Sequence, residues 1–215
     1  MTVRPTGLPG VLLFEPVVHA DGRGFFVEAF VSGRYAAHGL PTAWAQHNQS
    51  RSGRGTTRGL HVQVRRPQGK LVRVARGAVT DVVLDLRPGS PTFGRWEAHA
   101  LDDRAHRQLW IPPGLAHGFC VTSHEADVCY LVDAPYDPTD EGGVAWDDPD
   151  LAIAWPTLTP LTSAKDRLLP RLRDLAPTDL PHAPYVAPPD EGRSSDEGGS
   201  SDEGGSSSAS SSEGA

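Results

Sequence analysis

The sequence predicts an all-β domain, built as an antiparallel β-sandwich or jelly roll. Two observations carry this prediction. Short apolar stretches recur along most of the chain and are separated by Gly, Pro and Asp, a pattern typical of strands joined by turns. Helical periodicity is scarce over the same residues. Because several connections are long, a jelly roll is favoured over a simple meander.

Nine stretches fit buried or half-buried strands. In chain order they are Gly10–Val18, Phe25–Val31, Thr57–Val64, Lys70–Val74, Val79–Leu86, Arg95–Leu101, Gln108–Ile111, His117–Thr122 and Asp127–Val132. The tripeptide Arg76-Gly77-Ala78 separates two of them and predicts a hairpin. Short helices are predicted at residues 32–38 and 163–169, the second near the end of the domain.

The domain is predicted to span residues 1–175. A Pro-rich linker is predicted at 176–189, and a disordered acidic Ser/Gly-rich tail at 190–215. The tail holds no aromatic or branched aliphatic residue, so nothing there offsets the entropy cost of ordering the chain.

The charge of the chain is concentrated in that tail. The 215 residues contain 20 Lys+Arg and 27 Asp+Glu, for a formal charge of −7. Residues 190–215 hold seven carboxylates and one Arg, or −6, which leaves −1 for residues 1–189. A nearly neutral body lacks the basic surface that nucleic acid binding requires, so no nucleic acid partner is expected.

Other features predict a cytoplasmic protein without a membrane segment. The longest apolar runs are interrupted by Asp, and the N-terminus lacks the apolar stretch of a secretory signal. Two cysteines, Cys120 and Cys129, lie in apolar strand-like runs. They are interpreted as buried free thiols, with a bridge or a nucleophile as the alternatives.

The segment Arg58-Gly-Leu-His-Val-Gln63 lies on a predicted strand. With strict alternation, Arg58 points to one face and His61 to the other. Lys70 opens the next predicted strand after a short link, which makes the two strands candidate neighbours. It is one of only two lysines among the 20 basic residues, and its compact ammonium suits roles that a guanidinium does not fill.

The segment 112–119, Pro-Pro-Gly-Leu-Ala-His-Gly-Phe, resembles the second sequence motif of the cupins. Metal-binding cupins carry further histidine and glutamate ligands in the first motif, and this chain lacks that set. His117 and the distant His61 are too few ligands for a tight site, so no metal is expected.

The remaining chemistry is acid–base catalysis without a metal. It needs a base, an acid placed elsewhere, and positive charge for a developing oxyanion. His61, Tyr130 and Lys70 supply one of each. No nucleophile elbow, Walker loop or dinucleotide-binding fingerprint is present.

From about residue 10 to residue 172 the chain resembles the dTDP-4-dehydrorhamnose 3,5-epimerases, which have a cupin-like jelly roll. The motifs that carry the resemblance, in family order, are Asp21-Gly-Arg-Gly-Phe-Phe-Val-Glu28, Gln46-His-Asn-Gln-Ser50, Arg58-Gly-Leu-His-Val-Gln63, Gln68-Gly-Lys-Leu-Val-Arg73, Asp81-Val-Val-Leu-Asp-Leu-Arg87, Ser90-Pro-Thr-Phe-Gly94, Pro112–Phe119, Tyr130, Asp147–Leu151, Ile153–Pro156 and Leu161-Thr-Ser-Ala-Lys-Asp166.

The resemblance implies an isomerase that needs no cofactor. His61 would remove the protons at sugar carbons 5 and 3, both beside the ketone at carbon 4. Asp166 would orient His61, Lys70 would stabilise the enolate, and Tyr130 would return a proton from the opposite face.

The resemblance also implies the ligand contacts. Arg58, His117, Gln46 and Asn48 would hold a dTDP-sugar substrate, while Glu141 and Lys165 match further ligand positions. Arg23 and Glu28 would reach the substrate of a neighbouring subunit, which implies a homodimer.

Other interpretations remain open at the level of sequence. The chain fits an epimerase that inverts only carbon 3 or only carbon 5 in a deoxysugar pathway. A metal-dependent cupin enzyme and a non-catalytic nucleotide-sugar-binding jelly roll are further alternatives. For single residues, Asp81 and Asp85 fit exposed strand positions, and Asp166 fits a surface ion pair with Arg167 or Arg171.

Overall fold

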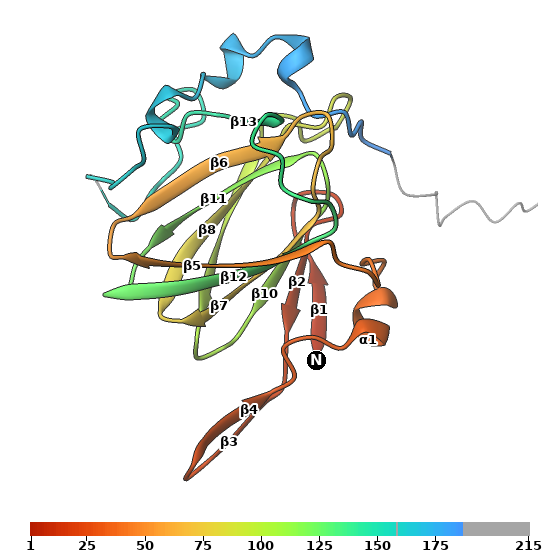
Figure 1. Ribbon diagram of the computed structural model, residues 1–215, viewed down its shortest axis with the longest axis vertical. Coiled ribbons are helices and arrows are strands. Elements are labelled where there is room, and N and C mark those ends of the chain that lie inside the picture. Colours follow the sequence, from red (N-terminus) through yellow and green to blue (C-terminus); the bar gives the residue numbers. More distant parts are fainter. Residues whose placement is uncertain (158, 187–215) are drawn as a thin grey trace, which may run out of the picture.

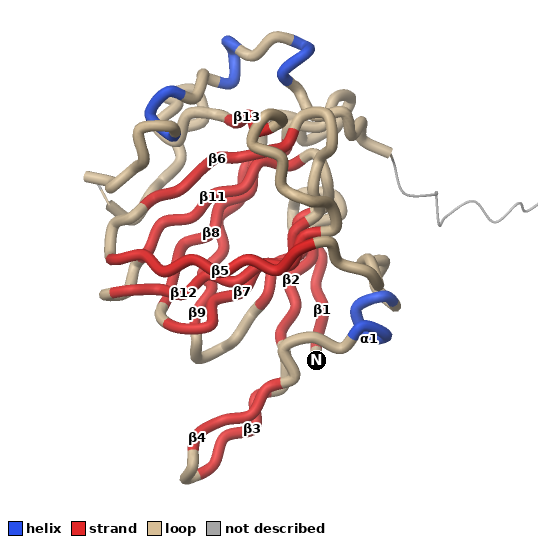
Figure 2. The backbone as a smooth tube through the Cα atoms, viewed as in Figure 1, coloured by secondary structure: helices blue, strands red, loops and turns tan. Residues whose placement is uncertain are grey.

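A computed structural model of the chain describes residues 1–157 and 159–186. It confirms the all-β prediction, because two antiparallel sheets face each other as in a jelly roll (Figure 1). The six-stranded sheet has the order β1-β2-β10-β7-β12-β5, and the five-stranded sheet has the order β13-β6-β11-β8-β9. Strands β3 and β4 form a separate hairpin that projects from the body (Figures 1 and 2).

The strands are β1 (Thr2–Pro5), β2 (Leu12–Glu15), β3 (Val18–Asp21), β4 (Gly24–Val27), β5 (Gln46–Gly53), β6 (Thr57–Gln63), β7 (Lys70–Arg76), β8 (Ala78–Asp85), β9 (Trp96–Asp102), β10 (Gln108–Ile111), β11 (Leu115–Val121), β12 (Glu125–Val132) and β13 (Glu141–Gly143). The helices are α1 (Ser32–Ala36) and the short 3₁₀ helices η1 (Asp166–Leu168), η2 (Leu172–Asp174) and η3 (Pro177–Asp179).

The main core lies between the two sheets. Val72 and Val128 from the six-stranded sheet and Val83 and Phe119 from the five-stranded sheet belong to one buried cluster. Burying each such side chain stabilises the fold by about 1.5–3 kcal/mol. This packing fixes the distance between the sheets and leaves room for a cavity beside the core.

The outer face of the five-stranded sheet is also buried. Leu60, Val82 and Leu84 pack there against residues from the C-terminal part of the chain, including Trp155 and Leu172. Strands covered on both faces need apolar residues at nearly every position. This explains why the run Val79–Leu86 is apolar at every position except Thr80 and its two aspartates.

The hairpin predicted at Arg76-Gly77-Ala78 is wrong. Strand β7 belongs to the six-stranded sheet and β8 to the five-stranded sheet, so the turn carries the chain from one sheet to the other. A tight turn of this sequence can join two paired strands of one sheet or carry the chain from one sheet to the other. Gly77, with φ +79°, supplies a tight reversal, but local sequence does not encode which sheet the next strand joins.

Strand β5 was not among the predicted strands. Its sequence, Gln-His-Asn-Gln-Ser-Arg-Ser-Gly, contains no apolar residue. It lies at the edge of the six-stranded sheet and pairs along its whole length with β12. This segment is a strand because its backbone pairs with the apolar strand β12, and not because its own residues favour β structure.

Both predicted helices form, in shortened versions. The first is α1, whose buried Tyr35 packs against Phe14. In the second, only Asp166–Leu168 is helical, as the 3₁₀ helix η1. Within the range predicted as a linker, residues 176–186 are described, and Pro181 is buried there. The domain boundaries stay a prediction, and the acidic tail lies outside the described residues.

Candidate active site

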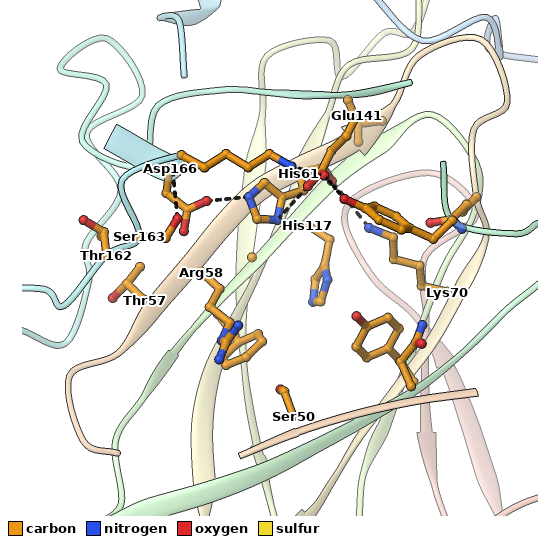
Figure 3. A pocket seen from close by; sticks show the side chains of 18 of the residues that line it. Ser50, Thr57, Arg58, His61, Lys70, His117, Glu141, Thr162, Ser163 and Asp166 are labelled. Carbon is orange, nitrogen blue, oxygen red and sulfur yellow. Dashed lines mark hydrogen bonds and ion pairs between the residues drawn. The ribbon is translucent and has the colours of Figure 1, made fainter. Parts of the chain in front are cut away.

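A cavity of about 640 Å³ opens between the two sheets. One wall comes from β5, β7 and β12, and the other from β6 and β11, while residues 161–166 lie at its rim. The lining includes all four predicted catalytic residues, His61, Lys70, Tyr130 and Asp166 (Figure 3). The structure thus gathers in one space four residues that are spread over 105 positions of the chain.

His61 and Asp166 form a hydrogen-bonded pair. Nε2 of His61, on β6, lies 2.6 Å from Oδ1 of Asp166, at the start of η1. Burial opposes ionisation of Asp166, but hydrogen bonds from His61 and Ser163 outweigh it and lower the pKa of this carboxyl. An ionised carboxylate accepts, so Nε2 carries the hydrogen and Nδ1 keeps the basic lone pair.

Glu141, on β13, faces the other nitrogen of the same imidazole. Its Oε1 lies 3.7 Å from Nδ1 of His61. Its Oε2 accepts hydrogen bonds from the Tyr136 hydroxyl and the Lys165 ammonium. Burial opposes ionisation of Glu141, but the hydrogen bonds from Lys165 and Tyr136 prevail, so the pKa of this carboxyl is lowered.

Lys70 enters the cavity from the opposite sheet, at the start of β7. Its Nζ lies 3.4 Å from the carbonyl oxygen of His61, to which it donates a hydrogen bond. Burial lowers the pKa of Lys70 to about 8, against the charges of Glu141 and Asp81, which raise it. The strands of Lys70 and His61 are therefore neighbours across the cavity and not within one sheet.

Tyr130 lies on β12, in the wall opposite the strand of His61. Burial raises the pKa of its phenol, while the positive charge of Arg58 opposes that shift. The phenol therefore keeps its proton at neutral pH and can donate it into the cavity. A base on one wall and an acid on the other address the two faces of a flat intermediate bound between them.

The remaining predicted ligand residues of the cavity surround this set. Gln46 and Asn48 lie side by side on β5 and share a hydrogen bond of 2.6 Å. Arg58 donates to the Ser52 hydroxyl from Nε and Nη2. His117, on β11, is buried and bonds through Nε2 to Oδ2 of Asp81 at 2.8 Å.

Arg23 and Glu28 lie apart from the cavity of their own chain. Arg23 is in the turn of the β3–β4 hairpin, where its side chain is 91% exposed and pairs with Asp21. Glu28 follows β4 and pairs with Arg34. The hairpin points away from the sheets, so it carries these residues outward (Figure 1). Lys165 and Glu141, by contrast, line the cavity.

Strict alternation along β6 is wrong, because Arg58 and His61 line the same cavity. On β11, His117 and Phe119 are two residues apart. Their partners on β6, His61 and Arg58, are three residues apart. The extra residue on β6 forms a bulge, and beyond a bulge the side chains of a strand point to the opposite face of the sheet from the one that strict alternation predicts. The bulge is thus what brings Arg58 to the side of His61.

The structure also corrects the surface interpretations of three carboxylates. Asp81 and Asp85 are fully buried. Asp85 forms an ion pair with Arg87 and accepts hydrogen bonds from Ser90 and Thr92, so it organises a turn. Asp166 is buried and pairs with His61, and not with Arg167 or Arg171 as the surface interpretation had it.

Sequence reasoning missed several residues of the cavity. Tyr136, Ser163 and Gln63 line it, and Asp81 supports it through His117. Tyr136 and Ser163 lie in loops without periodicity. Gln63 and Ser163 lie within the motifs that carry the resemblance, although no role was drawn for them. For Tyr136 the available signal was its nearness in sequence to Tyr130.

Three further findings concern metal, thiols and membrane. Within the described part of the chain, no three His, Cys, Asp or Glu side chains are grouped to hold a metal ion. Cys120 and Cys129 are buried free thiols. No helix in residues 1–157 or 159–186 has the length and hydropathy needed to cross a bilayer.

Fold and site together define a jelly-roll protein with an acid–base site enclosed between its sheets. A family model described as dTDP-4-dehydrorhamnose 3,5-epimerase matches residues 5–174. The chain belongs to this family.

Individual relatives agree with that membership. The dTDP-4-dehydrorhamnose 3,5-epimerase of Pseudomonas aeruginosa is 49% identical over 162 residues, 74% of this chain and 90% of that protein. The dTDP-4-dehydrorhamnose 3-epimerase of Streptomyces niveus is 49% identical over 185 residues, 83% of this chain and 89% of that protein. The matched part spans about half, 51%, of a longer relative from Neisseria gonorrhoeae.

A solved structure matches as well. The crystal structure of dTDP-6-deoxy-D-glucose-3,5-epimerase from Legionella pneumophila, in complex with dTDP-4-keto-L-rhamnose, has a TM-score of 0.82 and 41% sequence identity to this chain. The match covers 86% of this chain and 99% of that one.

Proposed function

We propose that this protein epimerises dTDP-4-dehydro-6-deoxy-D-glucose at carbons 3 and 5, giving dTDP-4-dehydro-L-rhamnose. The observation that carries the proposal is one cavity in which the His61–Asp166 pair faces Lys70 and Tyr130. Inversion beside a ketone moves only protons, so the reaction calls for no redox cofactor. Membership of the epimerase family supports the choice of substrate.

In the first half of each inversion, Nδ1 of His61 removes the proton from the carbon beside the ketone. Asp166 accepts the hydrogen bond from Nε2 and stabilises the imidazolium that forms. The electrons of the C–H bond pass into the enolate, whose oxygen the Lys70 ammonium stabilises in the closed, low-dielectric cavity.

In the second half, Tyr130 donates its phenolic proton to the opposite face of the same carbon. The enolate collapses to the ketone, and the carbon is inverted. Because carbons 3 and 5 both adjoin the ketone, one base and one acid serve both after the sugar shifts in the site.

The substrate contacts follow from the same cavity. Arg58 and His117 supply cations or donors for the diphosphate and sugar oxygens, and Gln46 and Asn48 supply amides. Glu141 and Lys165 complete the wall near the rim. We assign the enzyme to the cytoplasm, where nucleotide sugars are made and used.

A homodimer explains the position of the hairpin. Arg23 and Glu28 lie outside the cavity of their own chain, in exposed surface pairs with Asp21 and Arg34 that the substrate of a partner would replace or join. Phe25 and Phe26 on the same hairpin are 57% and 63% exposed. An exposed aromatic pair of this kind is typical of a surface that is buried in an assembly.

The proposal is tested by incubating the protein with dTDP-4-dehydro-6-deoxy-D-glucose in deuterated water and following both carbons by NMR. Deuterium at carbons 3 and 5, with inversion, is the expected result. Exchange at neither carbon contradicts the proposal. Exchange at one carbon replaces it with a single-centre epimerase, the activity for which the Streptomyces niveus relative is named.

A further inference from the structure

Each inversion leaves the proposed catalytic groups in the wrong protonation state. His61 has gained a proton, and Tyr130 has lost one. A second inversion in the same bound sugar requires His61 to lose its proton while the substrate still fills the cavity. The site therefore needs an exit for protons that does not pass through the substrate.

The surroundings of His61 supply one exit and exclude another. Asp166 holds Nε2 at 2.6 Å, but this carboxylate is itself buried, with only 4% of its side chain exposed. Glu141 faces Nδ1, the nitrogen that receives the abstracted proton, at 3.7 Å. In Figure 3 dashed lines run from the two nitrogens of His61 to these two carboxylates.

Glu141 connects this nitrogen to the solvent. Its side chain is only 9% exposed, yet its outer oxygen, Oε2, contacts two groups at the mouth of the cavity. One is Lys165, whose side chain is 54% exposed, and the other is Tyr136, which is 48% exposed. The His61 side chain is itself 28% exposed, into the cavity that the substrate is proposed to fill. With the sugar bound there, Glu141 offers Nδ1 a path to the rim that bypasses the substrate.

We propose that Glu141 is a proton relay that resets His61 between inversions. The proposal rests on the function given above and adds a role that acts through His61. Once His61 is charged, its imidazolium attracts the ionised Glu141, and the 3.7 Å gap closes by a side-chain shift or is bridged by one water. Nδ1 then gives its proton to Oε1 of Glu141, which restores neutral His61 and makes a carboxylic acid. That acid releases the proton to water at the rim, and the Tyr130 phenolate takes a proton back from water.

The resting geometry suits this role in two ways. At 3.7 Å, Oε1 is too far to hold Nδ1 in a hydrogen bond, so the lone pair stays available for the substrate proton. Lys165 and Tyr136 favour the ionised carboxylate, which lowers the pKa of Glu141. A carboxyl with a lowered pKa does not retain the proton, so Glu141 returns to the ionised form after each step.

The test uses the full-length Glu141→Gln variant, in which the amide keeps the size and the acceptor oxygen but cannot take up a proton. We expect kcat to fall about 100-fold with KM changed by less than about threefold. Sugar inverted at a single carbon should accumulate, because the second proton removal waits for the base to reset. Added imidazole buffer should restore kcat of the variant in a concentration-dependent way, because a small buffer carries protons in place of the relay.

Two controls keep the outcomes distinct. Glu125→Gln, at the start of β12 outside the cavity, should match the wild type in kcat and show no buffer dependence. If Glu141→Gln raises KM and its kcat does not respond to added imidazole, or if it keeps full kcat, Glu141 only binds ligand and the relay proposal is wrong. If the wild type itself shows no exchange in deuterated water, the proposed function fails, which is a different result.

Discussion

Oδ1 of Asp166 lies 2.6 Å from Nε2 of His61, although 105 positions of the chain separate the two residues. Asp166 comes from a 3₁₀ helix at the rim, and His61 from strand β6, which lies between β13 and β11. The short contact fixes the tautomer of the imidazole and thereby decides which nitrogen faces the substrate.

Asp166→Asn should therefore remove activity without unfolding the protein. An amide at this position can present its NH₂ group to Nε2 and stabilise the wrong tautomer, and it cannot balance an imidazolium. We expect the rate of deuterium exchange at both carbons to fall about 100-fold or more. Asp150→Asn, an exposed change elsewhere, is the control. An exchange rate within twofold of wild type would show that Asp166 is only structural.

Lys70→Met should inactivate the enzyme and stabilise the fold. Burial lowers the pKa of Lys70 from 10.5 to about 8, so the unfolded chain binds this proton more tightly than the folded one. At neutral pH the buried ammonium then costs stability of about 3 kcal/mol, and the cost fades as pH rises from 8 towards 10.5. Urea unfolding of the wild type and of Lys70→Met at pH 7 and pH 10 measures this cost. The variant should gain more free energy of unfolding over the wild type at pH 7 than at pH 10.

The same lysine sets an upper limit to the pH range of activity. The proposed role requires the ammonium, so kcat should decline as pH rises through about 8. Lys70→Arg keeps a charge but brings a larger planar group into a buried site, and it should remain inactive. Full activity in that variant would show that any cation suffices.

Tyr130→Phe should separate proton removal from inversion. The base His61 is untouched, so deuterium should still enter the substrate at the face from which the proton was taken. Inversion should slow by about 100-fold or more, because the donor on the opposite wall is missing. NMR of the sugar ring distinguishes exchange with retention from exchange with inversion. Equal losses in both would assign Tyr130 to binding.

Gly59→Ala should destabilise the active-site walls. A Cβ at Gly59 would lie 2.6 Å from the carbonyl oxygen of His117 and 2.7 Å from Cα of Gly118, and the residue has φ +101°. Strain and overpacking together should lower the free energy of unfolding by about 2–5 kcal/mol. Gly22→Ala, where a Cβ meets nothing within 4 Å, is the matched control and should change stability little.

Phe26→Asp should yield a monomer with weakened activity. A charge in place of this exposed aromatic ring on β4 opposes burial of the hairpin in a partner, and the monomer loses the contacts proposed for the partner's Arg23 and Glu28. Sedimentation measures the mass, and kinetics should show a raised KM for the dTDP-sugar. Phe93→Asp, an exposed phenylalanine on a loop, should leave both unchanged. A wild-type monomer in sedimentation would contradict the dimer.

Much of the fold was predictable because burial leaves local marks. The apolar composition of Val79–Leu86 and of His117–Thr122 predicts strands. The family motifs indicate that His61 and Lys70 act in the same site. Strand β5 left no such mark, since its eight residues are polar and gain their structure from pairing with β12. The turn at Gly77 was visible, but its role as a crossing between sheets was not.

By itself the sequence determined an all-β body, an acidic terminal segment without aromatic or branched aliphatic residues, and the candidates for a base, an acid and a stabilising lysine. Only the tertiary structure decided that a bulge turns Arg58 to the side of His61, that Asp81 lies buried behind His117, and that Glu141 faces the second nitrogen of the base. The physical reason is that periodicity records whether a residue is buried, while contacts between distant segments depend on how the two sheets pack.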